Sequence, residues 1–179
     1  MNLTDTNFIC QKVKSLLEGE SIMADGQLEV ILKMAQTINP QIESDRHFEI
    51  DLEKLRQLPK GTLGCEVARF LDEQGFEPIA SGDWIQRNHD VWHVLTNLSP
   101  STEDEFVLQA FTRAQVFRPS CTILVLVGLL SGKCAIRQII KGLKHGKLAA
   151  RLIDWDVASD WETPLSEVRE KLGILPLID

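Results

Sequence analysis

The chain lacks both a segment that could cross a bilayer and a recognisable leader. Its longest apolar stretch, residues 121–130, has about half the length that a membrane-spanning helix requires. Residues 1–17 interleave charged, polar and apolar side chains, which is atypical of a signal peptide and of a transit sequence. These absences predict a cytoplasmic protein without a transmembrane segment.

Cysteine is scarce and unpatterned. The four cysteines are scattered with no close pair, which argues against a disulfide framework and against a zinc knuckle. We expect reduced thiols in a cytosolic protein.

Acidic residues are missing from one long region. No Asp or Glu occurs in residues 106–153, where Lys and Arg contribute a charge of +8. Because the net charge is −7, the rest of the chain carries −15. An acidic chain with one basic third is typical of proteins that meet an anionic surface or ligand. Nucleic acid is not expected as the partner, because aromatic residues that could stack on bases do not interleave with these charges.

The remaining patterns predict an all-α fold. The length of 179 residues fits one domain over residues 1–179, and no convincing alternating strand occurs. We expect a single-domain helical bundle of about seven to eight helices, including a buried apolar helix and an amphipathic helix. The expected helices cover residues 6–18, 26–38, 51–58, 65–74, 119–130, 133–145 and 164–172, with a helical hairpin over residues 84–118.

The apolar helix is a candidate lipid contact. A helix that is apolar on every side is enclosed by protein or faces something apolar that is not protein. Gly128 in its middle leaves space for a close neighbour or a bound chain. Simple core packing is the alternative. The candidate lipid-binding residues are Cys121, Leu124, Val125 and Gly128.

The amphipathic helix gathers basic side chains on one side and isoleucines, among them Ile136, Ile139 and Ile140, on the other. Gly146 is expected to end it as a C-cap. The basic side is a candidate for an anionic membrane surface or head group, and a solvated face without a partner is the alternative. The residues concerned are Lys133, Arg137, Lys141 and Lys144.

The strongest chemical signal is a group of histidines and carboxylates in the hairpin. His89 and His93 are four residues apart, so on a helix their imidazoles point to the same side. Asp90 is close enough around the helix to ligate the same ion or to orient a histidine. A second helix starting near Thr102, capped by Ser or Thr, returns Glu105 to the height of His93. The four residues predict a divalent-metal site, and a chance pairing of two histidines is the alternative. Zinc suits this donor set best, with iron, manganese and magnesium as alternatives.

These residues belong to three blocks that together resemble a known family. The blocks are Leu58-Pro59-Lys60-Gly61-Thr62-Leu63-Gly64 with Arg69-Phe70-Leu71-Asp72; His89-Asp90, His93 and Glu105; and Trp161-Glu162 with Leu165, Arg169 and Leu172-Gly173-Ile174. In this order they resemble the coenzyme Q (ubiquinone) biosynthesis proteins with an HDxxH motif and a Glu after eleven further residues.

The resemblance implies a helical protein, peripheral to the membrane, that works with other quinone-biosynthesis proteins and carries a divalent metal, usually taken as zinc. It implies His89, Asp90, His93 and Glu105 as the metal set. Two roles are attributed to the family: a scaffold for a polyprenylated intermediate, and oxidative removal of the ring carboxyl at C1. For this chain it implies a place at the inner face of the membrane.

The chain departs from the family pattern beside the motif. Gln109 stands where a basic residue commonly follows the motif Glu by one turn, and Asp104 stands where a Gly usually precedes it. The segment before His89 is shorter and less rich in arginine. These departures leave the four expected metal ligands unchanged. They bear instead on the head-group chemistry that the family resemblance implies.

Three functions therefore remain open. In the first, a polyprenyl lipid or prenylated quinone precursor binds with its head group, a carboxylated phenol or a phosphate, at the metal, with C1 decarboxylation as its catalytic form. The second is a non-catalytic scaffold or carrier, favoured because no proton-transferring residue is recognisable and no catalytic residue can be assigned. The third is a zinc hydrolase, in which the shorter Asp90 would replace a glutamate base. A homodimer is a further open expectation.

Overall fold

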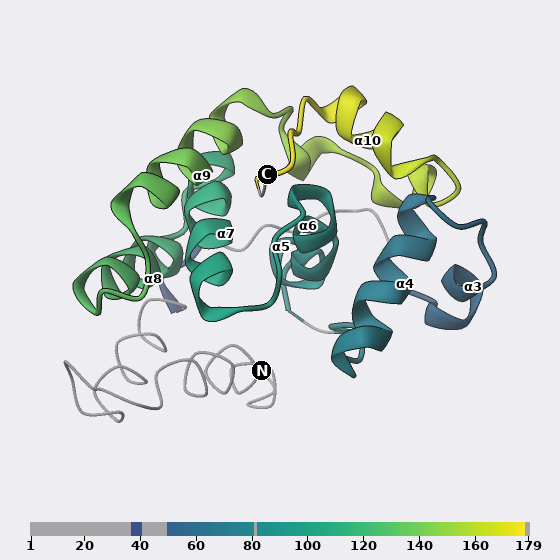
Figure 1. The fold of residues 1–179 in the computed structure, drawn as a ribbon, viewed down its shortest axis with the longest axis horizontal. Coiled ribbons are helices and arrows are strands. Elements are labelled where there is room, and N and C mark those ends of the chain that lie inside the picture. The colour runs from purple at the N-terminus through teal and green to yellow at the C-terminus, as the bar shows by residue number, and fades with distance from the viewer. Residues whose placement is uncertain (1–36, 41–49, 81, 178–179) are drawn as a thin grey trace. The chain divides into compact units, whose positions relative to one another are not determined.

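The computed structural model describes residues 37–40, 50–80 and 82–177 (Figure 1). These residues contain eight α-helices and no strand, which confirms the all-α prediction. No helix in these ranges is both long and apolar enough to span a membrane. The two helices expected over residues 6–38 lie almost entirely outside the described residues.

The helices follow one another with short connections. They are α3 (Leu52–Arg56), α4 (Leu63–Gln74), α5 (Trp84–Arg87), α6 (His89–Thr96), α7 (Thr102–Gln115), α8 (Pro119–Leu130), α9 (Ile136–Leu148) and α10 (Leu165–Leu172), with 3-10 turns at Leu152–Asp154 and Val157–Asp160. The region of the expected hairpin, residues 84–118, contains α5, α6 and α7.

The chain divides into two compact units. The first holds Ser99–Gly146 and with it α7 and α8 and most of α9, and the second holds Gln41–Leu98 and Lys147–Asp179. The single domain expected from the length stays a prediction.

In the first unit α9 packs closely on α7 because two glycines of α9 lie at the contact. A Cβ atom on Gly142 would lie 2.7 Å from the Val107 carbonyl oxygen, and one on Gly146 would lie 2.5 Å from that of Phe111. Backbone contact at this distance admits no side chain. The prediction of Gly146 as a C-cap is wrong, because the helix continues to Leu148. The buried side of α9 also differs from the expectation: Ile139 is buried, whereas Ile136 and Ile140 are exposed.

The apolar helix α8 is enclosed on one side only. Its buried residues are Ser120, Cys121, Leu124 and Gly128. The close neighbour of Gly128 is Phe106, because a Cβ atom on Gly128 would lie 2.6 Å from the Phe106 ring. On the other side of α8, Leu126 and Leu130 are exposed, the latter by 74%. Protein atoms thus cover half of this helix, and its other half presents apolar surface.

In the second unit, helix ends follow from capping residues. The Thr62 side chain accepts a hydrogen bond at the start of α4, and Gly75 ends the helix in the left-handed conformation. At α10 the N-cap is Pro164, and the hydroxyl of the preceding Thr163 donates a hydrogen bond to Asp160.

The second unit also joins two of the family blocks directly. Backbone hydrogen bonds run from Leu63 N to Thr163 O, from Gly64 N to Trp161 O, and from Leu165 N to Gly61 O, at 2.8–2.9 Å. Gly64 has no room for a side chain, because a Cβ atom would lie 2.6 Å from a methyl carbon of Leu58. The turn before α4 and the turn before α10 are therefore held together along their backbones.

Candidate metal centre

The two histidines lie on one side of α6, as their spacing predicts. The centroids of the His89 and His93 rings are 4.8 Å apart with the planes at 71°. His93 is fully buried and His89 is half-buried. Seven of the eight residues of α6 are buried, so this short helix is held by its surroundings rather than by its own helix propensity.

His93 is fixed in orientation by two neighbours of its own unit. Its Nδ1 lies 3.2 Å from the Leu98 carbonyl oxygen, and when Nδ1 carries the proton it donates to that oxygen. The Phe70 ring of α4 stacks on the imidazole, with centroids 5.4 Å apart and planes at 20°. A histidine held through Nδ1 presents Nε2 as its ligand atom, which is a common arrangement in metal sites.

The C-terminal end of α6 is held by Arg169, an arginine of the third family block. Arg169 of α10 donates from Nε to the Leu95 carbonyl oxygen at 2.9 Å and from Nη2 to that of Val94 at 2.8 Å. Helix ends leave carbonyl groups unsatisfied, and a guanidinium there satisfies two of them with favourable charge. Burial lowers the pKa of the Arg169 guanidinium, which still remains charged.

The first and third family blocks therefore meet around the histidine helix within the second unit. The first block supplies Phe70, which stacks on His93, and the third supplies Arg169, which holds the end of α6. Backbone hydrogen bonds also join the first block to the third. Residues far apart in the sequence thus serve one purpose, which is to fix the position of α6.

Glu105 lies in the first turn of α7, as predicted. The Ser101 side chain caps this helix by accepting a hydrogen bond from the Asp104 N–H. Glu105 is buried, and Gln109, one turn further on, donates from Nε2 to its Oε1 at 2.8 Å. The amide thus orients the carboxylate.

Three of the four predicted ligands, His89 and His93 of the second unit and Glu105 of the first, form a candidate metal-binding group. Asp90 is buried but is not part of this group; its Oδ1 lies 3.8 Å from Nδ1 of His89, beyond the distance of a hydrogen bond. Two imidazoles and one carboxylate are a donor set that fits a divalent ion with positions left for a ligand.

Among the described residues, Cys121 and Cys134 are not part of this candidate group. Burial raises the pKa of the Cys121 thiol to about 12 and that of the Cys134 thiol to about 11. Both remain protonated near neutrality and are poor metal ligands in that form. Nearby charges with smaller effects on the Cys121 pKa include Arg118 and Glu105, and Arg118 is a buried cation whose burial the sequence did not reveal.

The residues predicted to bind lipid and those predicted to face an anionic surface differ in burial. Of the lipid group, Cys121, Leu124 and Gly128 are buried and Val125 is half-buried. Of the basic group, Arg137 and Lys144 are exposed, while Lys133 and Lys141 are half-buried. Lys133 precedes α9, which starts at Ile136.

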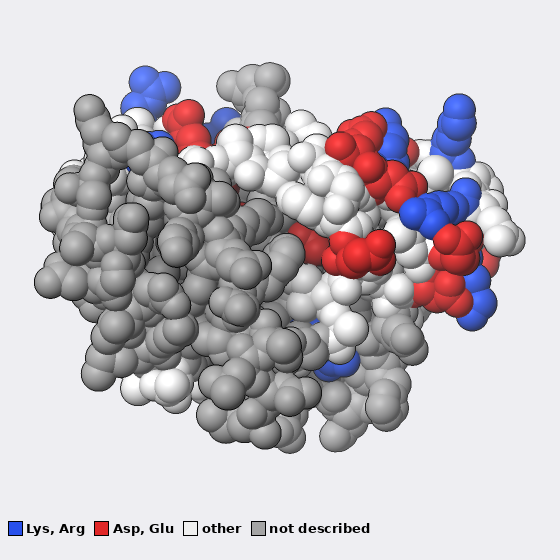
Figure 2. All heavy atoms as spheres, turned by 90° about the horizontal axis from the view of Figure 1, so that it is seen from below, with Lys and Arg blue, Asp and Glu red and all other residues white. Residues whose placement is uncertain are grey.

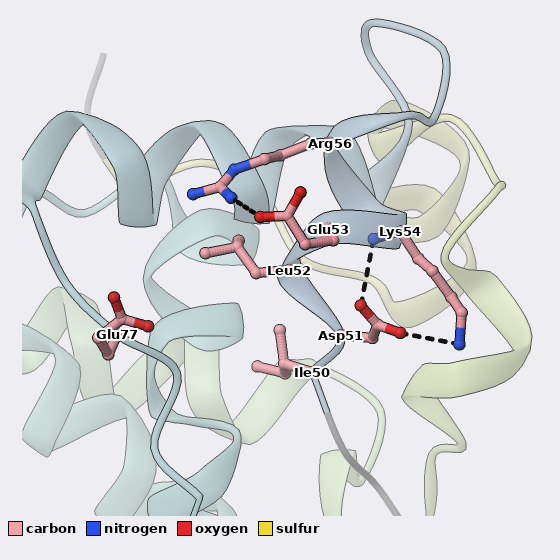
Figure 3. Close-up of a pocket in the computed structure, with 7 residues that line it drawn as sticks. All are labelled: Ile50, Asp51, Leu52, Glu53, Lys54, Arg56 and Glu77. Atoms are coloured by element: carbon pink, nitrogen blue, oxygen red, sulfur yellow. Dashed lines mark hydrogen bonds and ion pairs between the residues drawn. The ribbon is translucent and has the colours of Figure 1, made fainter.

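A surface pocket of about 520 Å³ lies elsewhere in the second unit. Its lining residues are Ile50, Asp51, Leu52, Glu53, Lys54, Arg56 and Glu77 (Figure 3). Asp51 is paired with Lys54, and Arg56 with Glu53 and Asp72, and these contacts hold the pKa of the Asp51 and Asp72 carboxyls below their usual range. Charges of both signs lie close together where α3 and α4 are seen (Figure 2). This balance contrasts with the purely basic side of α9.

Comparisons with known proteins agree with the family resemblance. Residues 84–177 match the family described as coenzyme Q (ubiquinone) biosynthesis protein Coq4. The mouse protein named ubiquinone biosynthesis protein COQ4 homolog, mitochondrial, is 29% identical over 147 residues, which are 71% of this chain and 55% of that protein. A relative from Pyricularia oryzae is 28% identical over 156 residues, 76% of this chain and 51% of that protein. The chain spans about half the length of these curated relatives.

A solved structure shares the fold. The crystal structure of a protein from Nostoc punctiforme, whose name links it to ubiquinone biosynthesis, matches with a TM-score of 0.59 at 21% identity and covers all of both chains. At this identity the match supports the helical fold alone.

Proposed function

We propose a function on the premise that this chain belongs to the family of coenzyme Q (ubiquinone) biosynthesis protein Coq4, as the match over residues 84–177 shows. The chain binds a prenylated quinone precursor or a prenyl phosphate, with the polar head group at a divalent-metal site. The proposal is carried by the candidate donor set of His89, His93 and Glu105, which in the proposed function converge on one ion.

The donor set and its supports favour a metal that accepts a ligand. His89, His93 and Glu105 would hold the ion, and zinc is the ion we propose. Such an ion acts as a Lewis acid toward a carboxylate, phenol or phosphate oxygen. The chain's own contribution is to fix the histidine through Leu98 and Phe70 and the carboxylate through Gln109.

The apolar tail has a candidate surface on the first unit. Leu126, Leu130 and Ile136 are exposed on α8 and α9, although large apolar side chains are normally buried. Basic residues of α9, among them Arg137 and Lys144, are exposed on the same pair of helices. Apolar and basic side chains together suit an anionic membrane surface, from which an insoluble lipid would be loaded.

A carrier role is favoured over turnover by the contacts at the site. His93 and Glu105 are held by a carbonyl, a phenyl ring and an amide, and these groups orient a side chain rather than transfer protons. In the carrier form the chain presents its lipid to other quinone-biosynthesis proteins. In the catalytic form it would also remove the ring carboxyl at C1. A single-turnover assay, run with oxygen as the oxidant, for carbon dioxide release from a precursor labelled at the carboxyl carbon distinguishes the two forms.

The binding proposal is tested with defined probes. Tryptophan fluorescence from the buried Trp84 and Trp92 would be titrated with farnesyl phosphate, 3-farnesyl-4-hydroxybenzoate and, as the control without an anionic head, farnesol. Zinc-loaded protein should bind at least one anionic probe about tenfold more tightly than metal-stripped protein, with no such difference for farnesol. Equal affinity of loaded and stripped protein for both anionic probes would overturn the proposal.

A further inference from the structure

The C-terminal end of α6 turns back on a histidine that the helix itself carries. The Leu98 N–H donates to the His93 carbonyl oxygen at 3.1 Å, and the Asn97 N–H donates to that of Val94 at 3.3 Å. This pair of bonds closes many helices, and it requires the residue just after the helix to adopt the left-handed conformation. Asn97 has this conformation, with φ 59° and ψ 29°.

The same turn reaches the imidazole ring. His93 Nδ1 lies 3.2 Å from the Leu98 carbonyl oxygen, so the Leu98 backbone contacts His93 twice, through its N–H and through its carbonyl group. The Leu98 side chain is buried, which anchors this residue in the core of the second unit. The contact that leaves Nε2 of His93 as its ligand atom therefore depends on the turn at Asn97.

Asn97 is an unusual residue in backbone conformation. Among the described residues it is the one residue other than glycine with a positive φ, whereas Gly75 and Gly173 take the same position after α4 and α10. Its side chain is exposed and has no hydrogen-bond partner in the described part of the chain. Glycine and asparagine adopt the left-handed conformation most readily, and a β-branched residue adopts it only under strain. The residue type at position 97 therefore acts through the backbone rather than through side-chain contacts.

We propose that Asn97 is a positioning residue for the metal ligand His93, because its left-handed conformation brings the Leu98 carbonyl oxygen to Nδ1 and leaves Nε2 to the ion. This inference rests on the proposed function and deepens it. A β-branched side chain at position 97 is relieved of strain when the turn opens. Opening the turn moves the Leu98 carbonyl oxygen away from Nδ1, because one residue makes both contacts with His93. The loss of a group that orients a metal-bound histidine usually lowers metal affinity by about tenfold or more.

The zinc affinity of matched variants, measured by competition with a zinc chelator, tests the inference. Asn97→Val should bind zinc about tenfold more weakly than the wild type, whereas Asn97→Gly, which keeps the turn without strain, should bind within about twofold of it. Gly132→Val is the control, because Gly132 has φ 68°, lies in open space and belongs to the first unit. It introduces the same side chain with similar backbone strain and should lower the melting temperature without changing zinc affinity. Should Asn97→Val fail to fold, the less strained Asn97→Ala takes its place and should bind zinc more weakly than Asn97→Gly.

The tautomer of His93 separates positioning of the imidazole from a general loss of stability. In nitrogen–proton correlation spectra of the zinc-free protein, His93 should carry its proton on Nδ1 in the wild type and in Asn97→Gly, and Asn97→Val should lose this preference. A wild type with the proton on Nε2 would overturn this inference alone. So would an Asn97→Val protein that binds zinc as tightly as the wild type, or an equal loss of affinity in Gly132→Val. A wild type that binds no zinc would overturn the proposed function as well.

Discussion

Helices α6 and α8 are both short and rich in apolar residues, yet they differ in which side chains are buried. In α6 the polar side chains are buried: His93 is stacked on Phe70 and bonded to Leu98, and Arg169 holds the helix end. In α8 the apolar side chains are partly exposed, with Leu126 and Leu130 facing away from the protein core.

This difference in burial indicates a different role for each helix. Burying imidazole and carboxylate groups is unfavourable unless they are bonded, so the contacts around α6 indicate a site that the fold is built to hold. Leu126 and Leu130 are exposed on the outer side of α8, and in the proposed function an apolar lipid or membrane surface covers them.

The largest expected effect comes from removing the support of α6. Arg169→Ala should lower the free energy of unfolding by about 3 kcal/mol, because two partly buried hydrogen bonds from a charged group are lost. Urea unfolding followed by circular dichroism measures it. Arg69→Ala removes an exposed arginine of α4 and should cost less than about 0.5 kcal/mol. Equal effects of the two substitutions would contradict the special role of Arg169.

The hydrogen bonds of Asp160, in the same unit as Arg169, should make the stability of the protein depend on pH. Although burial raises the pKa of the Asp160 carboxyl, hydrogen bonds from Lys171 and Trp155 outweigh it, and the pKa lies below its usual value of 3.8. The ionised carboxylate therefore contributes stability above the unfolded pKa, which is lost as the pH falls through the folded pKa. Asp160→Asn should cost about 2 kcal/mol at pH 7 and much less near pH 2. A loss that is the same at both pH values would contradict this account.

Charge reversal tests the outer side of the first unit. Arg137→Glu with Lys141→Glu should weaken sedimentation with anionic liposomes by about 2 kcal/mol of binding free energy in moderate salt, since each basic residue near such a surface contributes roughly 1 kcal/mol before screening. Stability should stay within about 0.5 kcal/mol, because Arg137 is exposed and Lys141 is half-buried. Raising the salt concentration should weaken wild-type binding similarly. A charge-reversed protein that sediments as well as the wild type would show that this surface has another role.

A smaller effect, on zinc affinity, is expected from the hydrogen bond between the Gln109 amide and the Glu105 carboxylate. Gln109→Leu removes the hydrogen bond to Glu105 and should weaken zinc binding about tenfold, as is usual for residues that orient a ligand. Competition with a zinc chelator measures the change. Gln115→Leu, in the same helix, alters a contact with the Gly146 carbonyl oxygen and should leave zinc affinity unchanged. If the two variants bind zinc equally, Gln109 does not position Glu105.

The parts of the fold that could be predicted depend on local chemistry. The spacing of His89 and His93, the cap at Ser101 and the stop at Gly75 are all set by residues within a few positions of one another. Such signals can be read along a sequence because they do not need the path of the rest of the chain.

The parts that escaped prediction depend on residues distant in the sequence. Gly146 looked like a helix end because its role as a contact with Phe111 of α7 is visible only once the two helices are packed. Arg169 belonged to a recognised block, yet its bonds to Val94 and Leu95 join positions more than seventy residues apart. The exposed side of α8 could not be inferred either, because a helix with apolar residues on every side gives no periodic signal.

The central claim, that His89, His93 and Glu105 hold one divalent ion, is tested most directly by the metal content of the purified protein. Native mass spectrometry would compare the wild type, His93→Ala with Glu105→Ala, and the surface control Arg69→Ala, each checked for folding by circular dichroism. The wild type and the control should carry one divalent ion per chain, and the double variant should retain less than about a tenth of it. A folded double variant that keeps its full metal content would contradict the claim.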